Sequence, residues 1–108
     1  MTSRALLVLT TCANAEEAQR LAVELVERRL AACVNTVNQI ASTYRWQGKV
    51  EQGQESLLVI KTTEERFAAL EAIIRERSSY DLPEVLAIRV LGGSAQFLEW
   101  LGASVGDQ

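Results

Sequence analysis

Side chains that could bind a ligand or take part in a reaction cluster in one connecting segment, RERSSYDLPEV, at residues 75–85. It holds Pro83, the only proline, and Tyr80 and Asp81, each one of two residues of its type. Glu84 adds a second carboxylate. A phenol and two carboxylates offer oxygen ligands to a cation, or hydrogen-bond partners to a small molecule. The same residues fit a rigid corner of an interface, so the segment predicts either a ligand site or a structural corner.

Histidine is absent from the chain, and this absence removes many mechanisms. A Ser-His-Asp triad, a Cys-His pair and imidazole metal ligands are all excluded. The only cysteines, Cys12 and Cys33, lack the spacing of a zinc cage. Cys33 is expected to be a small buried apolar residue, whereas Cys12 follows the first predicted strand, where it could be exposed and bind metal. We therefore expect that the protein is not an enzyme.

Composition indicates one globular domain spanning residues 1–108, with 48% hydrophobic residues. The formal net charge of −3 argues against a nucleic-acid partner, which would require a basic face. No run approaches the ~20 apolar residues that span a bilayer, so no membrane partner is expected. The short apolar run near the N-terminus is predicted as a strand and not as a secretory leader, which makes the cytoplasm the expected compartment.

Hydrophobic periodicity predicts strands that alternate with helices. The predicted strands are residues 5–11, 33–46, 56–63 and 84–91, the last introduced by Pro83. The predicted helices run from Asn14 to about Leu30, along a core face of Phe67, Leu70, Ile73 and Ile74, and over residues 94–101. The order β-α-β-β-α-β plus a helix predicts an α+β ferredoxin-like fold with both crossing helices on one face of the sheet.

Local signals refine these elements. Asn14 with Glu17, and Thr62 with Glu65, have the spacing of a capping box that opens a helix. The long second strand is predicted to bulge around Ala41–Ser42.

Three predicted strands are apolar at successive positions, as the runs ALLVL, LLVI and VLAI show. A sheet with helices on only one face should instead alternate apolar and polar residues. A second copy of the chain is therefore expected to cover the open face. The hairpin that carries Tyr44 and Trp46 is a candidate interlocking element between subunits.

Five segments, LAACVN, YRWQGKVE, KTTEERF, YDLPE and FLEWL, resemble in order and spacing the signature segments of the CutA family. That family is linked to divalent-cation tolerance, and the resemblance covers nearly the whole chain. It implies ferredoxin-like subunits assembled as a homotrimer similar to the PII signalling proteins. It also implies a response to metal ions, with copper or another divalent cation as the candidate ligand.

The resemblance also suggests where a metal would bind. Family members associated with copper carry a cysteine at the end of the first strand and histidines before the PYxxPE segment. Here the cysteine position falls on Thr10, and the histidine positions fall on Arg77 and Ser78. Cys12 lies two residues after Thr10, on the same face of a strand, and is the candidate substitute.

The predicted metal ligands are accordingly Cys12, Asp81 and Glu84, a set that favours hard or borderline cations. Lys61 ends an apolar strand, where its charge should find a carboxylate, and pairing with Glu84 across a subunit boundary is expected.

The residues Lys61, Tyr80, Tyr44 and Trp46 form the predicted ligand-binding or interface cluster. Two alternatives remain open beside metal response. One is a PII-like regulatory module that binds a small anionic metabolite between subunits, with Lys61 supplying the charge. The other is a trimeric scaffold in which the cluster only fixes the assembly.

Overall fold

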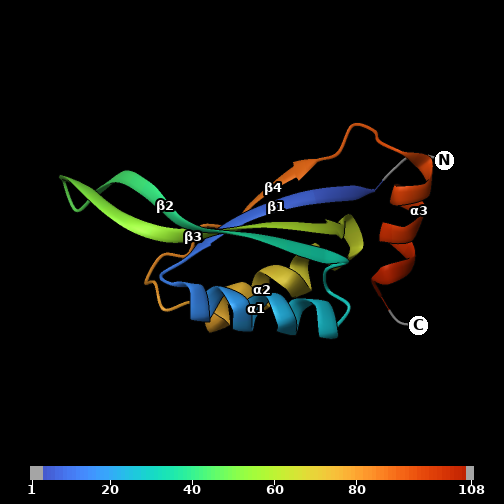
Figure 1. Ribbon diagram of the computed structural model, residues 1–108, viewed down its shortest axis with the longest axis horizontal. Helices are drawn as coiled ribbons and strands as arrows, with labels where there is room; N and C mark the ends of the chain where they lie inside the picture. Colours follow the sequence, from blue (N-terminus) through green and yellow to red (C-terminus); the bar gives the residue numbers. More distant parts are fainter. Residues whose placement is uncertain (1–3, 107–108) are drawn as a thin grey trace.

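The order of elements agrees with the sequence prediction (Figure 1). The computed structural model describes residues 4–106, which form an antiparallel four-stranded sheet of order β2-β3-β1-β4. The elements are β1 (Ala5–Cys12), α1 (Ala15–Glu27), β2 (Cys33–Trp46), β3 (Lys49–Thr63), a 3₁₀ turn (Glu64–Arg66), α2 (Phe67–Arg77), β4 (Leu86–Arg89) and α3 (Ala95–Ser104). This is the predicted α+β ferredoxin-like arrangement.

The main core lies between the sheet and the two helices that cover one of its faces, α1 and α2 (Figure 1). Alternate residues of β1 and β3 point into it, and the helices contribute residues at three- and four-residue spacing. Its most completely buried large side chains are Val8, Leu25, Leu58, Ile60, Leu70 and Ile74.

The opposite face of the sheet carries apolar residues that α1 and α2 do not cover. Leu9 pairs with both Val59 and Leu86, which places these three side chains together on that face. Leu86 is 56% exposed, and Ile88, two residues along β4, is 49% exposed. The prediction of strands that are apolar on both faces is confirmed.

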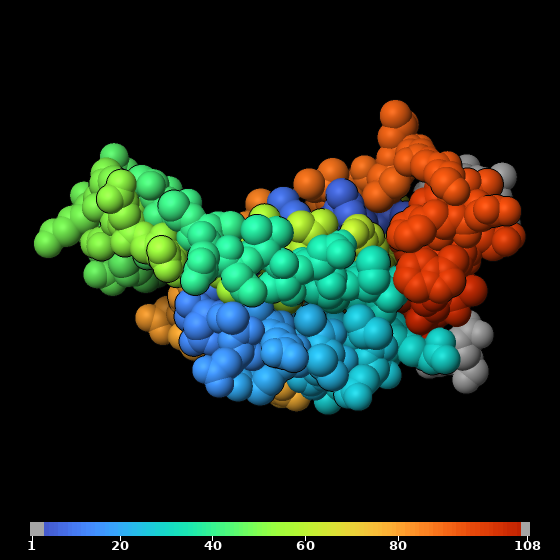
Figure 2. Space-filling model, in the orientation of Figure 1, coloured from blue at the N-terminus to red at the C-terminus, as the bar shows by residue number. Residues whose placement is uncertain are grey.

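A long hairpin formed by β2 and β3 extends beyond the helices as an arm (Figures 1 and 2). Its turn consists of Gln47 and Gly48, which both have positive φ, at 51° and 82°. Two such residues make the tight turn whose twist matches paired strands. Pairing therefore resumes at once, and β3 begins at Lys49 and not at Ser56 as predicted.

The bulge in β2 lies earlier than predicted. Its register shifts between Val37 and Ile40 and not at Ala41–Ser42, because Gln39 adopts a left-handed φ of 58°. The extra residue places Ile40 opposite Glu55 and adds twist to the arm.

The start of α1 is as predicted, whereas its end is not. The Asn14 side chain accepts a 2.9 Å hydrogen bond from the backbone N–H of Glu17. The helix ends at Glu27 instead of Leu30, because Arg29 has a left-handed φ of 59° that turns the chain.

The second predicted capping box is wrong. The Thr62 hydroxyl is buried and donates a 2.6 Å hydrogen bond to the carbonyl of Leu30, so it cannot cap a helix. A 3₁₀ turn separates β3 from α2 instead. The last strand is also shorter than predicted and spans Leu86–Arg89, and Glu84 before it lines the site described next.

Candidate functional site

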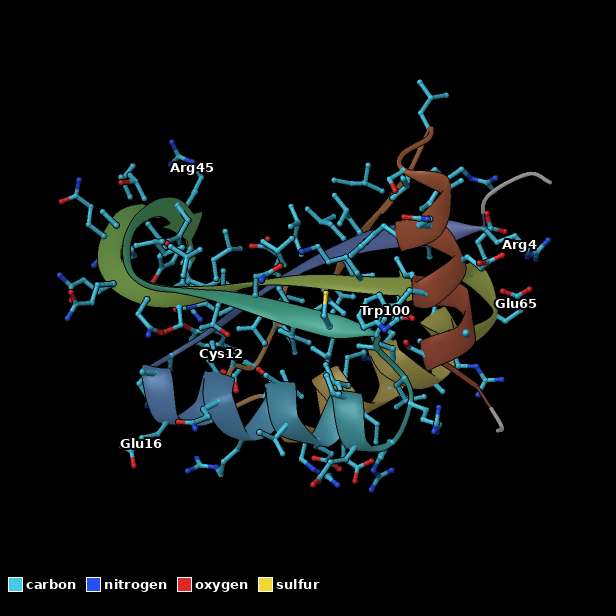
Figure 3. All side chains as sticks on the ribbon, turned by 45° about the vertical axis from the view of Figure 1, so that its right-hand side comes forward. Arg4, Cys12, Glu16, Arg45, Glu65 and Trp100 are labelled. Carbon is cyan, nitrogen blue, oxygen red and sulfur yellow. The ribbon has the colours of Figure 1, made fainter. Side chains whose placement is uncertain are left out.

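The hairpin arm and the connector after α2 enclose a groove of about 690 Å³. Segments far apart in the sequence meet here, with Ser42–Trp46 and Glu55 on the arm and Ser79–Leu82 on the connector. Five predicted candidates line this groove: Tyr44, Trp46, Tyr80, Asp81 and Glu84. The arm with Arg45 and helix α3 with Trp100 lie at opposite ends of the sheet (Figure 3).

A hydrogen bond joins the two walls of the groove. The Tyr80 hydroxyl donates to Oε2 of Glu55 at 2.7 Å. Burial acts to raise the pKa of Glu55, but hydrogen bonds from Ser42, Tyr80 and Thr11 outweigh it and hold that pKa below its usual range. Burial, then the hydrogen bond to Glu55, raises the pKa of Tyr80 well above its usual range. At neutral pH the groove therefore holds a carboxylate and a neutral phenol.

The connector is fixed to the sheet by its backbone. The Thr10 hydroxyl donates a 2.6 Å hydrogen bond to the carbonyl of Glu84. The backbone N–H of Tyr80 donates to the Ser78 hydroxyl at 3.0 Å. The first bond ties the end of the connector to β1, and the second is a local turn directly after α2. The side chains of Asp81 and Glu84 line the groove. The connector is thus a structural corner and one wall of a groove at the same time.

Cys12 lines a second, smaller cavity of about 210 Å³. The expectation that it follows the strand in an exposed position is wrong: Cys12 is the last residue of β1 and only 3% exposed, next to the start of α1 (Figure 3). Burial, with the charges of Glu17 and Glu55, raises the pKa of its thiol to about 12. The metal-free thiol is therefore protonated at neutral pH, and a metal ion that bound here would have to displace that proton.

The same small cavity collects the positions that the family resemblance associates with copper. Thr10, Arg77 and Ser78 line it together with Cys12. The Arg77 guanidinium already donates two hydrogen bonds to the carboxylate of Glu24, from Nε and Nη2, each at 3.0 Å. A hydroxyl pair, a guanidinium and a protonated thiol do not fit a copper ion, which prefers imidazole and thiolate.

The predicted metal ligands are divided between the two cavities. Cys12 lies in the small one, whereas Asp81 and Glu84 lie in the groove, and the two cavities share only Thr11 among their lining residues. Over residues 4–106, no group of three or more cysteine, aspartate or glutamate side chains is placed to hold a metal ion. The metal-binding role of these three residues stays a prediction.

Lys61 lies outside the groove, on the open face of the sheet. Its ammonium group donates a hydrogen bond to the side-chain oxygen of Asn35 on the neighbouring strand. Cys33, its partner in the β2–β3 register, is half-buried on the same face. Pairing of Lys61 with Glu84 across a subunit boundary stays a prediction.

Sequence reasoning did not single out Ser42, Arg45 and Glu55, which are among the polar and charged residues that line the groove. Glu55 was missed because the predicted third strand begins only at Ser56, whereas β3 begins at Lys49 and includes Glu55. For Ser42 and Arg45 no local signal exists, since the displaced bulge changes the course of the arm that brings them to the groove.

The geometry defines a PII-like α+β subunit with a carboxylate-lined groove at the base of an extended hairpin. A family profile described as CutA1 divalent ion tolerance protein matches residues 6–104. A solved CutA1 structure from Oryza sativa is 41% identical, with a TM-score of 0.94 over 99% of this chain and 98% of that one. A divalent cation tolerance protein structure from Thermus thermophilus is also 41% identical, with a TM-score of 0.92 over 94% and 99% of the two chains. The chain belongs to the CutA1 divalent ion tolerance family.

Curated relatives differ in length and in the compartments that they are named for. The Thermus thermophilus divalent-cation tolerance protein CutA is 42% identical over 92% of this chain and 96% of its own length. The chain spans only about half the length of the chloroplastic CutA proteins of rice and Arabidopsis thaliana, at 44% and 43% identity. One solved relative, from Archaeoglobus fulgidus, is named as periplasmic. Among residues 4–106, every helix is too short to cross a lipid bilayer.

Proposed function

We propose that this protein serves the cellular response to divalent metal ions as a homotrimer, through binding and without catalysis. Membership of the divalent ion tolerance family supports the cellular role. The cytoplasm stays the predicted compartment, beside relatives that are named for the chloroplast and the periplasm.

An uncovered apolar face supports the assembly. Leu86 and Ile88 are each about half exposed or more, beside the half-buried Leu7 and Leu9. A contiguous apolar surface of this kind favours burial against another subunit. The threefold symmetry comes from the family resemblance. Native mass spectrometry of the full chain tests it, because a trimer has three times the 11.9 kDa mass of one chain.

We place the cation site in the groove, and one observation carries this choice: Asp81, Glu84 and Glu55 line a single cavity. Glu55 already accepts the 2.7 Å hydrogen bond of the Tyr80 hydroxyl, so Asp81 and Glu84 are the carboxylates that we assign to a metal ion. Two oxygen ligands favour hard cations held with much of their water, such as Mn²⁺ or Mg²⁺, and weak binding. Copper, the ion suggested by the resemblance, is not favoured by these donors.

The experiment is a titration of metal-stripped protein with Mn²⁺, Cu²⁺ and Zn²⁺, read by native mass spectrometry. Retained Mn²⁺ should fall in the double variant Asp81→Asn with Glu84→Gln, and should persist in Cys12→Ser and in the distant control Glu99→Gln. Retention that depends on Cys12 but not on the two carboxylates would move the site to the small cavity. Absence of metal from all forms would remove the metal-binding proposal.

The alternative ligand, a small anionic metabolite, required Lys61 to supply the positive charge. Lys61 lies on the open face and donates to Asn35, and the groove does not include it. Loss of anion binding in Lys61→Met, with metal retention intact, would support the metabolite-binding alternative.

A further inference from the structure

The groove has an excess of negative charge. The carboxylates of Glu55, Asp81 and Glu84 line it, and among its lining residues only Arg45 carries a positive charge. Glu55 accepts a 2.7 Å hydrogen bond from the Tyr80 hydroxyl, which favours its ionised form. A concave surface with this balance concentrates cations and repels anions.

Aromatic side chains accompany these carboxylates. Tyr44 and Trp46 line the groove from the arm and remain 49% and 39% exposed. Exposed aromatic rings can pack against the apolar body of an organic ligand and attract a nearby ammonium or guanidinium group, whereas a hydrated metal ion needs no such surface. The Tyr80 hydroxyl already donates its hydrogen bond to Glu55, so its oxygen is left with lone pairs that accept a hydrogen bond.

We propose that the groove binds a compact organic cation, a molecule that carries an ammonium or guanidinium group on a small apolar body. Asp81 and Glu84 accept its N–H donors in charge-assisted hydrogen bonds, and Tyr44 and Trp46 contact its apolar part. The volume of about 690 Å³ lies within the range of small-molecule sites, roughly 300–1,000 Å³. This inference rests on the proposed function only in its location, because an organic cation and a metal ion would compete for the same carboxylates.

Three probes of one shape and different charge test the inference: benzylammonium, benzyl alcohol and benzoate. Each is titrated into metal-stripped full-length protein in phosphate buffer and followed by NMR. Benzylammonium should bind at least about tenfold more tightly than benzyl alcohol, the ratio expected from one charge-assisted hydrogen bond. Benzoate should bind most weakly. The indole N–H resonance of Trp46 should shift, and that of Trp100 on α3 should not.

Charge variants sharpen the test. Asp81→Asn with Glu84→Gln should weaken benzylammonium binding about tenfold or more. Arg45→Gln should strengthen it about threefold, because the competing positive charge is removed. Glu99→Gln on α3 is the matched control and should change nothing. Equal affinities for the three probes, or benzoate as the tightest ligand, would overturn the inference.

The same protein separates this inference from the proposed metal function. If the protein binds benzylammonium but retains no Mn²⁺, the organic-cation inference stands and the metal-binding proposal is wrong. Retained Mn²⁺ without benzylammonium binding would do the reverse. Absence of both would overturn both.

Discussion

The Tyr80 hydroxyl donates a 2.7 Å hydrogen bond to the Glu55 carboxylate and so joins the connector after α2 to the hairpin arm. The two residues are 25 positions apart in sequence and belong to different walls of the groove. Their contact holds one wall against the other, and it combines a neutral donor with an ionised acceptor. Its removal should therefore affect stability and the shape of the groove together.

Tyr80→Phe removes this hydrogen bond and keeps the aromatic ring. We expect a loss of about 1 kcal/mol in the free energy of unfolding, because the lost bond joins a phenol to a partly buried carboxylate. Urea denaturation measures it. Tyr44→Phe is the matched control, since the Tyr44 ring is half exposed on the arm, and its unfolding midpoint should stay unchanged. Equal midpoints for Tyr80→Phe and the parent protein would contradict a stabilising contact.

Glu55→Gln should lower stability in a pH-dependent way. The pKa of Glu55 in the folded protein lies below its ordinary value of 4.5, so the ionised form stabilises the fold. That contribution is fully present above pH 4.5 and is lost as the pH falls through the depressed folded pKa. The difference in unfolding free energy between the parent and Glu55→Gln should therefore shrink below pH 4.5. A difference that stays constant as the pH falls from neutral through this window would exclude this origin.

Leu58 and Val59 are neighbours on β3 that point to opposite faces. Leu58 is fully buried beneath the helices, and Leu58→Ala should cost about 2–5 kcal/mol of unfolding free energy. Val59 is half-buried on the open face, so Val59→Lys should leave circular dichroism intact and convert the assembly to monomers. Light scattering coupled to gel filtration measures the mass of the Val59→Lys protein in solution. A Val59→Lys protein that keeps the parent mass would show that the open face is not the interface.

Cys12 should resist alkylation in the folded protein. With the thiol buried and its pKa raised to about 12, little thiolate is present under mildly alkaline labelling conditions. A Cys33→Ser variant leaves one thiol, whose reaction with iodoacetamide should be at least about a hundredfold slower than in urea. Rapid labelling under native conditions would mean that Cys12 becomes accessible and is available to a metal.

The order of strands and helices was determined by the sequence itself. Val8 and Leu58 belong to apolar runs that indicate strands, and Asn14 marks the start of a helix. These signals can be read from the sequence because each depends only on neighbouring residues. Tyr80, Asp81 and Glu84 were also identifiable, since aromatic and acidic residues gathered in a connector lack an obvious place in a core. Tyr44 and Trp46 were identifiable as aromatic residues at the end of the hairpin.

Only the tertiary structure decided which of these residues meet. A left-handed Gln39 displaced the bulge and so placed Ile40 opposite Glu55, an outcome that no local pattern predicts. The register of β1 with β3 turned Cys12 into the core, whereas sequence position alone suggested a loop. The spacing of residues along the chain determines which helices and strands form. The pairing of strands that are distant in sequence determines which side chains line the same cavity.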